Sequence, residues 1–184
     1  MLTLSKRDTS SKSELTKIRR AGDIPAVMYS AKQGSVAVTV PGDEYAAILR
    51  GVKEGYLPVT VFTLKLDGKE HKAIVKGIEY HKTTYNVTHI DFQILEDNTP
   101  LLVKVPVNFT GEVDCEGIKL GGFLRKVMRH VKVRCLPKDM PADFPVDIRH
   151  LVIGSTTKVA DIKPVEGVKL LVKPKDVLAV IAKR

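Results

Sequence analysis

The sequence predicts a mainly β protein with short helices, built from two successive β-rich domains. Apolar and polar residues alternate through several short segments, which is the two-residue period of a strand with one buried face. Glycines and prolines interrupt these segments at regular intervals, as they do in β-barrels and β-sandwiches. Asp67-Gly68 lies between two such segments, and both central residues of a type I′ hairpin turn need positive φ. These observations favour a barrel or a sandwich over a helical fold.

A short helix is predicted from Ser11 to Ala21. Ser11 and Glu14 have the spacing of a capping box, and Gly22 is placed to end the helix. The apolar side chains share one face of this helix, namely Leu15 and Ile18. Another face carries Lys12, Thr16 and Arg19.

A second short helix is predicted from Asp43, its cap, to Arg50, and Gly51 is expected to end it. The strands predicted in the first half are Val36–Val40, Val59–Leu66, His71–Tyr80 and Asn86–Leu95. In the last strand the buried face is expected to hold Ile90, Phe92 and Ile94. Its opposite face would then carry His89, Asp91 and Gln93.

The second half is also rich in predicted strands. Residues 96–100 are polar and acidic and end in Pro100, so they suit a linker between a domain of residues 1–95 and one of residues 101–184. The inward residues of the first strand are expected to be Leu101, Val103, Val105, Val107 and Phe109. Other predicted strands are Val131–Cys135, in which Lys132 and Arg134 alternate with apolar residues, and Val168–Val172 and Val177–Ile181. A β-turn or bulge is expected in the glycine-rich segment from Gly117 to Gly122.

Positive charge is concentrated in two places. The 184 residues include 30 Lys and Arg against 21 Asp and Glu, a net charge of +9 that favours a polyanionic partner over a merely basic soluble protein. The first cluster, in residues 1–22, comprises Lys6, Arg7, Lys12, Lys17, Arg19 and Arg20 against two acids. The second has no acid within it and comprises Lys119, Arg125, Lys126, Arg129, Lys132, Arg134 and Lys138.

The scarcity of aromatic residues restricts the kind of nucleic acid. The chain has no Trp and only 5% aromatic residues, too few for a platform that stacks single-stranded bases. A structured RNA helix, contacted at phosphates, hydroxyls and groove edges, is the better expectation. Cys115 and Cys135 form no CxxC motif and are expected to be buried free thiols.

No enzyme signature is found in the sequence. It has no Walker loop, GxGxxG, GxSxG or HExxH motif, and its five histidines are scattered, so neither catalysis nor a metal or cofactor is expected. His89 and Asp91 project from one strand face, but a catalytic dyad would need a third partner. They could contact RNA hydroxyls or base edges, or they could form a solvated or cross-strand pair. Both interpretations stay open at this stage.

Location is predicted from the ends and from hydropathy. The start, Met1 to Arg7, lacks the apolar core of a signal peptide, and the apolar stretch Val177–Ala182 is far too short to span a membrane. A cytoplasmic protein without membrane contact is therefore expected.

Several segments then resemble one family. Lys17 to Tyr29 resembles the pattern LRxxGxIPAVxYG of the bacterial ribosomal protein L25 family, and Thr88 to Phe92 resembles that family's HxDF ending. The second half resembles the extra domain of the long members, called the CTC or general stress protein form. The segments that carry this second resemblance are Val103 to Val107, Gly111-Glu112, Gly117, Gly121-Gly122, Val146 to Ile148 and Leu151 to Gly154.

The resemblance implies an N-terminal β-barrel that binds a helical internal-loop region of 5S rRNA in the large ribosomal subunit. Carried over by position, the RNA contacts would be Arg7, Lys12, Arg19, Tyr29, Lys76, His89 and Asp91. The predicted RNA-binding set also includes Thr16 and Arg20. Three positions depart from the family pattern. Thr16 stands where Arg is common, Ser30 follows Tyr29 in place of Gly, and His81-Lys82 replaces His-Pro.

The C-terminal domain is expected to offer a second contact surface to neighbouring large-subunit rRNA or ribosomal proteins, or else a solvated face. The residues of that surface would be Lys119, Arg125, Lys126, Arg129, Lys132 and Arg134. The protein is expected to act as a monomer within the ribosome. A stress-induced protein–protein adaptor without direct RNA binding is the alternative from another class. Recognition of tRNA anticodons is disfavoured, because splayed bases call for more stacking rings.

Overall fold

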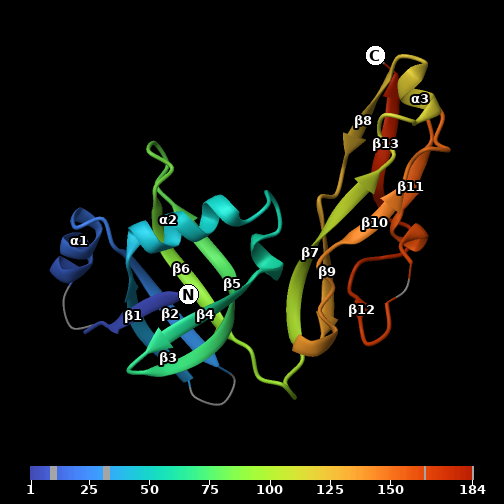
Figure 1. Ribbon diagram of the computed structural model, residues 1–184. Helices are drawn as coiled ribbons and strands as arrows, with labels where there is room; N and C mark the ends of the chain where they lie inside the picture. The colour runs from blue at the N-terminus through green and yellow to red at the C-terminus, as the bar shows by residue number, and fades with distance from the viewer. Residues whose placement is uncertain (9–11, 31–33, 164, 184) are drawn as a thin grey trace. The chain divides into compact units, whose positions relative to one another are not determined.

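The computed structural model describes residues 1–8, 12–30, 34–163 and 165–183. The chain divides into two compact units, Met1–Thr99 and Pro100–Arg184, and both are built mainly from strands (Figure 1). The prediction of a mainly β protein with an N-terminal barrel and a second β-rich part is confirmed. Within the described ranges, no helix is both long and apolar enough to cross a membrane.

Unit 1 is a closed barrel of six strands in the order β1-β3-β2-β6-β5-β4. The strands are β1 (Leu2–Lys6), β2 (Ile24–Ser30), β3 (Gly34–Val40), β4 (Val61–Leu66), β5 (Lys69–Tyr80) and β6 (Val87–Ile94). β1 runs parallel to β4 and β2 runs parallel to β6, whereas the other neighbours are antiparallel. Closure pairs both edges of the sheet, so the barrel presents no long open edge to other chains.

The barrel core follows from strand alternation. Ile90 and Phe92 are fully buried, as predicted, and Ile94 is half-buried. Helix α2 (Gly42–Gly51) adds Tyr45 to this core, and the ring centroid of Tyr45 lies 6.5 Å from that of Phe62. Burying each of these aromatic side chains stabilises the fold by about 1.5–3 kcal/mol.

The turns and short helices explain where the predictions succeeded and failed. Asp67 and Gly68 have φ of 49° and 78°, which confirms the predicted turn between β4 and β5. The strand predicted from residue 59 begins only at Val61, because Leu57–Val59 forms a 3-10 helix with a proline in its first turn. Pro41, rather than Asp43, occupies the cap position of α2, and no side chain caps that helix.

Gly42 opens α2 for a steric reason. A Cβ atom at this position would lie 2.1 Å from the backbone oxygen of Gly22, which follows the first helix. Asp43 therefore lies in the first turn of α2, where a negative charge is favourable to the helix dipole. The close approach fixes the corner between the two helices.

Helix α1 (Lys12–Arg20) ends as the sequence predicts. The amide of Gly22 donates to the Arg19 carbonyl, the amide of Asp23 donates to the Ile18 carbonyl, and Gly22 has φ of 91°. Leu15 and Ile18 are half-buried, whereas Thr16 and Arg19 are exposed, as predicted, and the side chain of Lys12 lies outside the described residues. The predicted cap Ser11 lies outside the described residues.

Unit 2 contains two sheets, β10-β7-β9-β12 and β11-β13-β8. Their strands are β7 (Leu101–Thr110), β8 (Gly122–Lys126), β9 (His130–Cys135), β10 (Phe144–Asp147), β11 (Thr156–Lys158), β12 (Lys169–Leu170) and β13 (Val177–Lys183). The remaining helices are α3 (Glu116–Lys119) and two 3-10 helices, Pro137–Asp139 and Val159–Asp161. In β7 and β9 the alternation is as predicted, although Val107 and Phe109 are only half-buried. Cys115 and Cys135 are buried and free.

Two predictions for unit 2 were wrong in detail. The predicted turn in the segment from Gly117 to Gly122 is present only at Leu120-Gly121, where Gly121 has φ of 92°, whereas Gly117 lies in α3. A Cβ at Gly117 would lie 2.9 Å from both Ile181 and the Leu151 carbonyl, so this position requires glycine. The strand predicted over residues 168–172 is paired only at Lys169–Leu170.

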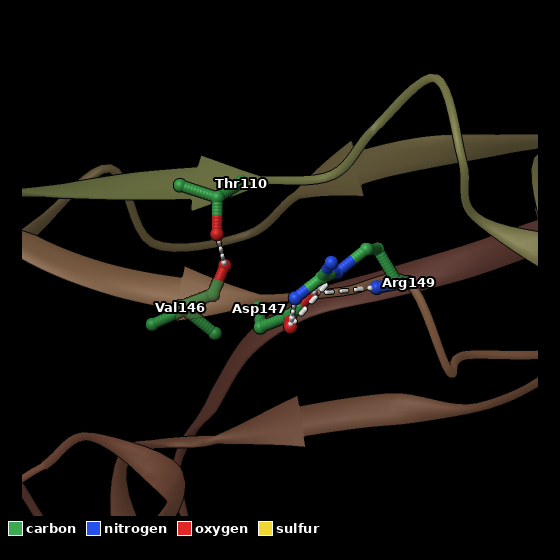
Figure 2. Close-up of polar contacts among 4 residues, drawn as sticks. All are labelled: Thr110, Val146, Asp147 and Arg149. Atoms are coloured by element: carbon green, nitrogen blue, oxygen red, sulfur yellow. Dashed lines mark hydrogen bonds and ion pairs between the residues drawn. The ribbon is translucent and has the colours of Figure 1, made fainter.

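An ion pair lies at the end of β10. Both Nε and Nη2 of Arg149 donate to the Asp147 carboxylate, at distances of 2.6 to 3.0 Å (Figure 2). These hydrogen bonds lower the pKa of Asp147 to about 2. Gly111 lies under the pair, since a Cβ at Gly111 would lie 2.2 Å from Cγ of Arg149. Nearby, the Thr110 hydroxyl donates to the Val146 carbonyl, which connects β7 to β10 (Figure 2).

Candidate nucleic-acid interface

One row of residues crosses the outer surface of the barrel from Arg7, just after β1, to β5. The amide of Arg7 donates to the Ala37 carbonyl at 3.0 Å, Ala37 lies opposite Val27, and Val27 lies opposite Asp91. Asp91 in turn lies opposite Gly77. Residues directly opposite each other share a sheet face, so this row forms one surface. Most side chains in this row are short, so the sheet surface is low there and the neighbouring polar groups stand above it.

Tyr29, His89 and Asp91 form the polar centre of this surface. Nδ1 of His89 lies 3.1 Å from Oδ1 of Asp91, and both side chains are partly exposed. Burial raises the pKa of Tyr29 above its ordinary value, and the nearby charge of Asp91 raises it further. The Tyr29 phenol therefore stays protonated at physiological pH and can donate a hydrogen bond.

A β-bulge in β5 shapes the edge of the same surface. Val75 lies opposite Phe92 and Gly77 lies opposite Asp91, so Lys76 is the extra residue. A Cβ at Gly77 would lie 3.1 Å from Oδ2 of Asp91, so glycine at this position avoids a close contact with the carboxylate. Lys76 is exposed beside this gap.

Arg19 connects α1 to the strand that carries His89. Its Nε and Nη2 atoms donate to the backbone carbonyl of Thr88 at 3.2 and 3.1 Å. Thr88 directly precedes His89 in β6, so the contact holds the basic helix next to the polar centre. Because one carbonyl engages only part of the guanidinium, Arg19 keeps N–H groups for another acceptor.

The other predicted residues differ in how the structure places them. Arg7 is half-buried, and its Nε is buried without a hydrogen-bond partner among the residues described. Thr16 and Arg20 are exposed on α1. The side chain of Lys12 lies outside the described part of the chain. The geometry thus joins Tyr29, His89 and Asp91 on the adjacent strands β2 and β6, with Arg19 attached through Thr88. Arg7 lies at the far end of the same row, beyond β3.

Two departures from the family pattern have local explanations. Ser30 is buried, and its hydroxyl donates to the Glu96 carboxylate, so this substitution is accommodated inside the barrel. In the β5–β6 turn, Nδ1 of His81 lies 3.1 Å from the hydroxyls of both Thr83 and Thr84. The imidazole of His81 therefore organises the turn without the proline that is common in the family.

A cavity of about 490 Å³ lies beside this turn, between the end of α1 and α2. Its polar lining includes Arg19, Asp43, His81 and Asn86. Tyr45 also lines the cavity, and its hydroxyl is buried and has no hydrogen-bond partner within the described ranges. Sequence patterns gave no sign of this cavity, because its walls come from three separate segments.

The strand residues of the second basic cluster are divided between the two sheets of unit 2. Arg125 and Lys126 lie on β8, whereas Lys132 and Arg134 lie on β9 in the other sheet. Two members are neutralised locally: Nζ of Lys119 lies 3.6 Å from Asp114, and Nζ of Lys126 lies 3.9 Å from Glu112. In the described ranges, no group of His, Cys, Asp and Glu side chains is arranged to hold a metal ion.

Comparisons with known proteins agree with this two-part architecture. Residues 2–92 match the Ribosomal L25p family, and residues 100–184 match the description "Ribosomal protein TL5, C-terminal domain". These matches place the chain among ribosomal proteins, a structural class that is not an enzyme family.

Full-length relatives identify the family. The chain is 39% identical over 183 residues to the large ribosomal subunit protein bL25 of Chlamydia trachomatis serovar A and to that of Chlamydia muridarum. Each alignment covers 100% of this chain and 99% of the relative. The chain belongs to the bL25 family of large-subunit ribosomal proteins, which confirms the resemblance found in the sequence.

Proposed function

We propose that the chain binds a helical internal-loop region of 5S rRNA through the outer face of its barrel and helix α1. The observation that carries the proposal is the contact between Arg19 and the Thr88 carbonyl, which holds a basic helix beside His89 and Asp91. The cationic helix α1 therefore lies next to a low polar sheet face, and an RNA helix can contact both. The binding is structural and involves no turnover.

Positive side chains around the face would neutralise phosphates. The cations assigned to this role are Arg7, Lys12, Arg19, Arg20 and Lys76. Each phosphate contact releases condensed counterions, so affinity falls as salt rises. The Thr16 hydroxyl, exposed on α1, donates to a phosphate at the position where Arg is common in the family.

The polar centre would supply specificity. Asp91 accepts from a ribose hydroxyl or from a base amino group, and Tyr29 donates through its protonated phenol. Nδ1 of His89 is engaged by Asp91, so Nε2 is the nitrogen that faces RNA. The absence of a side chain at Gly77 lets a groove edge approach the Asp91 carboxylate closely.

A salt titration tests the phosphate contacts. Labelled 5S rRNA is titrated with the full chain and with the double variant Arg20→Gln, Lys76→Gln at several salt concentrations. The slope of log affinity against log salt should decrease by about 2. The matched control is Arg50→Gln, Lys69→Gln, which removes two exposed charges from α2 and from the start of β5. Equal slopes for the two variants would contradict the assignment. Partners retained after RNA removal, with no 5S rRNA binding, would favour an adaptor instead.

A further inference from the structure

Four cations share one exposed sheet face of unit 2. Lys104 on β7 lies directly opposite Lys132 on β9, and Arg134 on β9 lies directly opposite Lys169 on β12. All four side chains are exposed, while the alternate residues Val131 and Val133 are buried beneath them. Strand register therefore gathers residues that are far apart in sequence into one array of positive charge.

Repulsion among these four cations destabilises the sheet when no partner is bound. Directly opposite side chains have Cβ atoms about 4.5–5.5 Å apart, and like charges at that spacing repel each other. None of the four cations forms an ion pair with a carboxylate among the residues that the structure describes. By contrast, Lys119, Lys126 and Arg149 of the same unit each have a carboxylate partner. The four-cation array thus lacks the local neutralisation seen elsewhere in unit 2.

We propose that this sheet face binds the phosphate backbone of large-subunit ribosomal RNA other than 5S rRNA. Successive outward residues of a strand lie about 7 Å apart. Lys132 and Arg134 are two such residues, and each faces a further cation across the sheet. An extended polyanion can contact all four side chains, and it removes their mutual repulsion when it binds. We expect this polyanion to be RNA, because the chain belongs to a family of large-subunit ribosomal proteins.

The proposed contact is independent of 5S rRNA binding by the barrel. Of the residues predicted for a second contact surface, the proposal keeps Lys132 and Arg134. It adds Lys104 and Lys169, which lie outside the cluster seen in the sequence. The exposed Leu102, opposite Arg134, gives the array an apolar border on which ribose or base edges can pack.

The test compares two full-length variants that each lose two charges. Lys104→Gln, Lys132→Gln alters the array, whereas Lys158→Gln, Lys183→Gln removes exposed charges from the β11-β13-β8 sheet. The probe is protein-free large-subunit ribosomal RNA without the 5S chain, titrated at several salt concentrations. The array variant should reduce the salt slope by about 2, and the control variant should leave it unchanged.

Thermal unfolding gives a second readout. The array variant should melt at the same temperature as the original chain or higher, because a like-charge pair is removed. Equal RNA affinities and slopes for the two variants would overturn the proposal. So would a loss of polyglutamate binding without a loss of RNA binding, since the face would then serve an acidic protein. A change in 5S rRNA binding alone would concern the barrel and would also contradict this assignment.

Discussion

The guanidinium of Arg19 donates two hydrogen bonds to the backbone carbonyl of Thr88, across 69 positions of sequence. This contact joins helix α1 to β6 at the residue before His89. Arg19 therefore has two separable properties: a planar fork that positions the helix and a positive charge that attracts phosphate.

Arg19→Lys separates these two properties. Lysine keeps the charge, but its ammonium group cannot place two parallel N–H groups on one carbonyl. We expect 5S rRNA affinity to fall about tenfold, which corresponds to about 1.4 kcal/mol, with the salt slope unchanged. Arg19→Ala should lower both affinity and slope. Fluorescence anisotropy with labelled 5S rRNA measures both quantities.

Arg50→Lys is the matched control, because Arg50 is also an exposed arginine near the end of a helix. It should bind like the original chain. If Arg19→Lys also binds with full affinity, the Thr88 contact does not position the helix for RNA binding.

Asp91→Asn tests the polar centre without changing its size. Because the Asp91 charge contributes to the raised pKa of Tyr29, the variant should lower that pKa, and the part due to burial should remain. Replacing one acceptor oxygen of the carboxylate by an amide donor should also cost about 1–3 kcal/mol of RNA binding. Tyrosine titration by NMR and an RNA titration check the two effects. An unmoved Tyr29 titration would show that the two groups do not interact.

Gly42→Ala should destabilise unit 1 by about 1–3 kcal/mol, because the new methyl group meets the Gly22 carbonyl at the corner between α1 and α2. Urea unfolding measures the loss. Gly51→Ala is the control, since a Cβ there meets no atom within 4 Å. Equal stability of the two variants would mean that the corner is not tightly packed.

Arg149→Gln should change the acid dependence of unit 2. The folded-state pKa of Asp147 is lowered from 3.8 to about 2, so its contribution to stability is present above about pH 4 and is lost as pH falls toward 2. Without Arg149 the pKa should return toward 3.8, and this acid-dependent loss should shrink. Carboxyl NMR titration of Asp147 checks the shift. An unchanged Asp147 pKa in the variant would contradict the assigned cause.

Local signals in the sequence were sufficient for many elements. Asp67-Gly68 predicted its turn because positive φ at both positions is a strong local requirement, and Gly22 predicted the end of α1 for a similar reason. Alternation placed Ile90 and Phe92 in the core. The resemblance, rather than alternation, singled out the barrel over a sandwich.

The remaining features depend on long-range register, which local patterns do not encode. The parallel pairing of β2 with β6 places Val27 opposite Asp91, and no turn signal specifies it. Arg19 binds a backbone carbonyl, an acceptor that every residue has, so Thr88 carried no signature in the sequence. Likewise, Lys169 lies outside the basic cluster in the sequence, and only the pairing of β12 with β9 brings it next to Arg134.

The most direct test of the RNA-binding account is a gel-shift competition at physiological salt. The full chain is bound to labelled 5S rRNA and challenged with unlabelled 5S rRNA or with tRNA of equal total charge. We predict that 5S rRNA displaces the probe at a concentration at least about 1,000-fold lower than tRNA, the lower end of typical specificity ratios. Displacement by both RNAs at equal concentration, or no shift at all, would contradict specific 5S rRNA binding by the barrel.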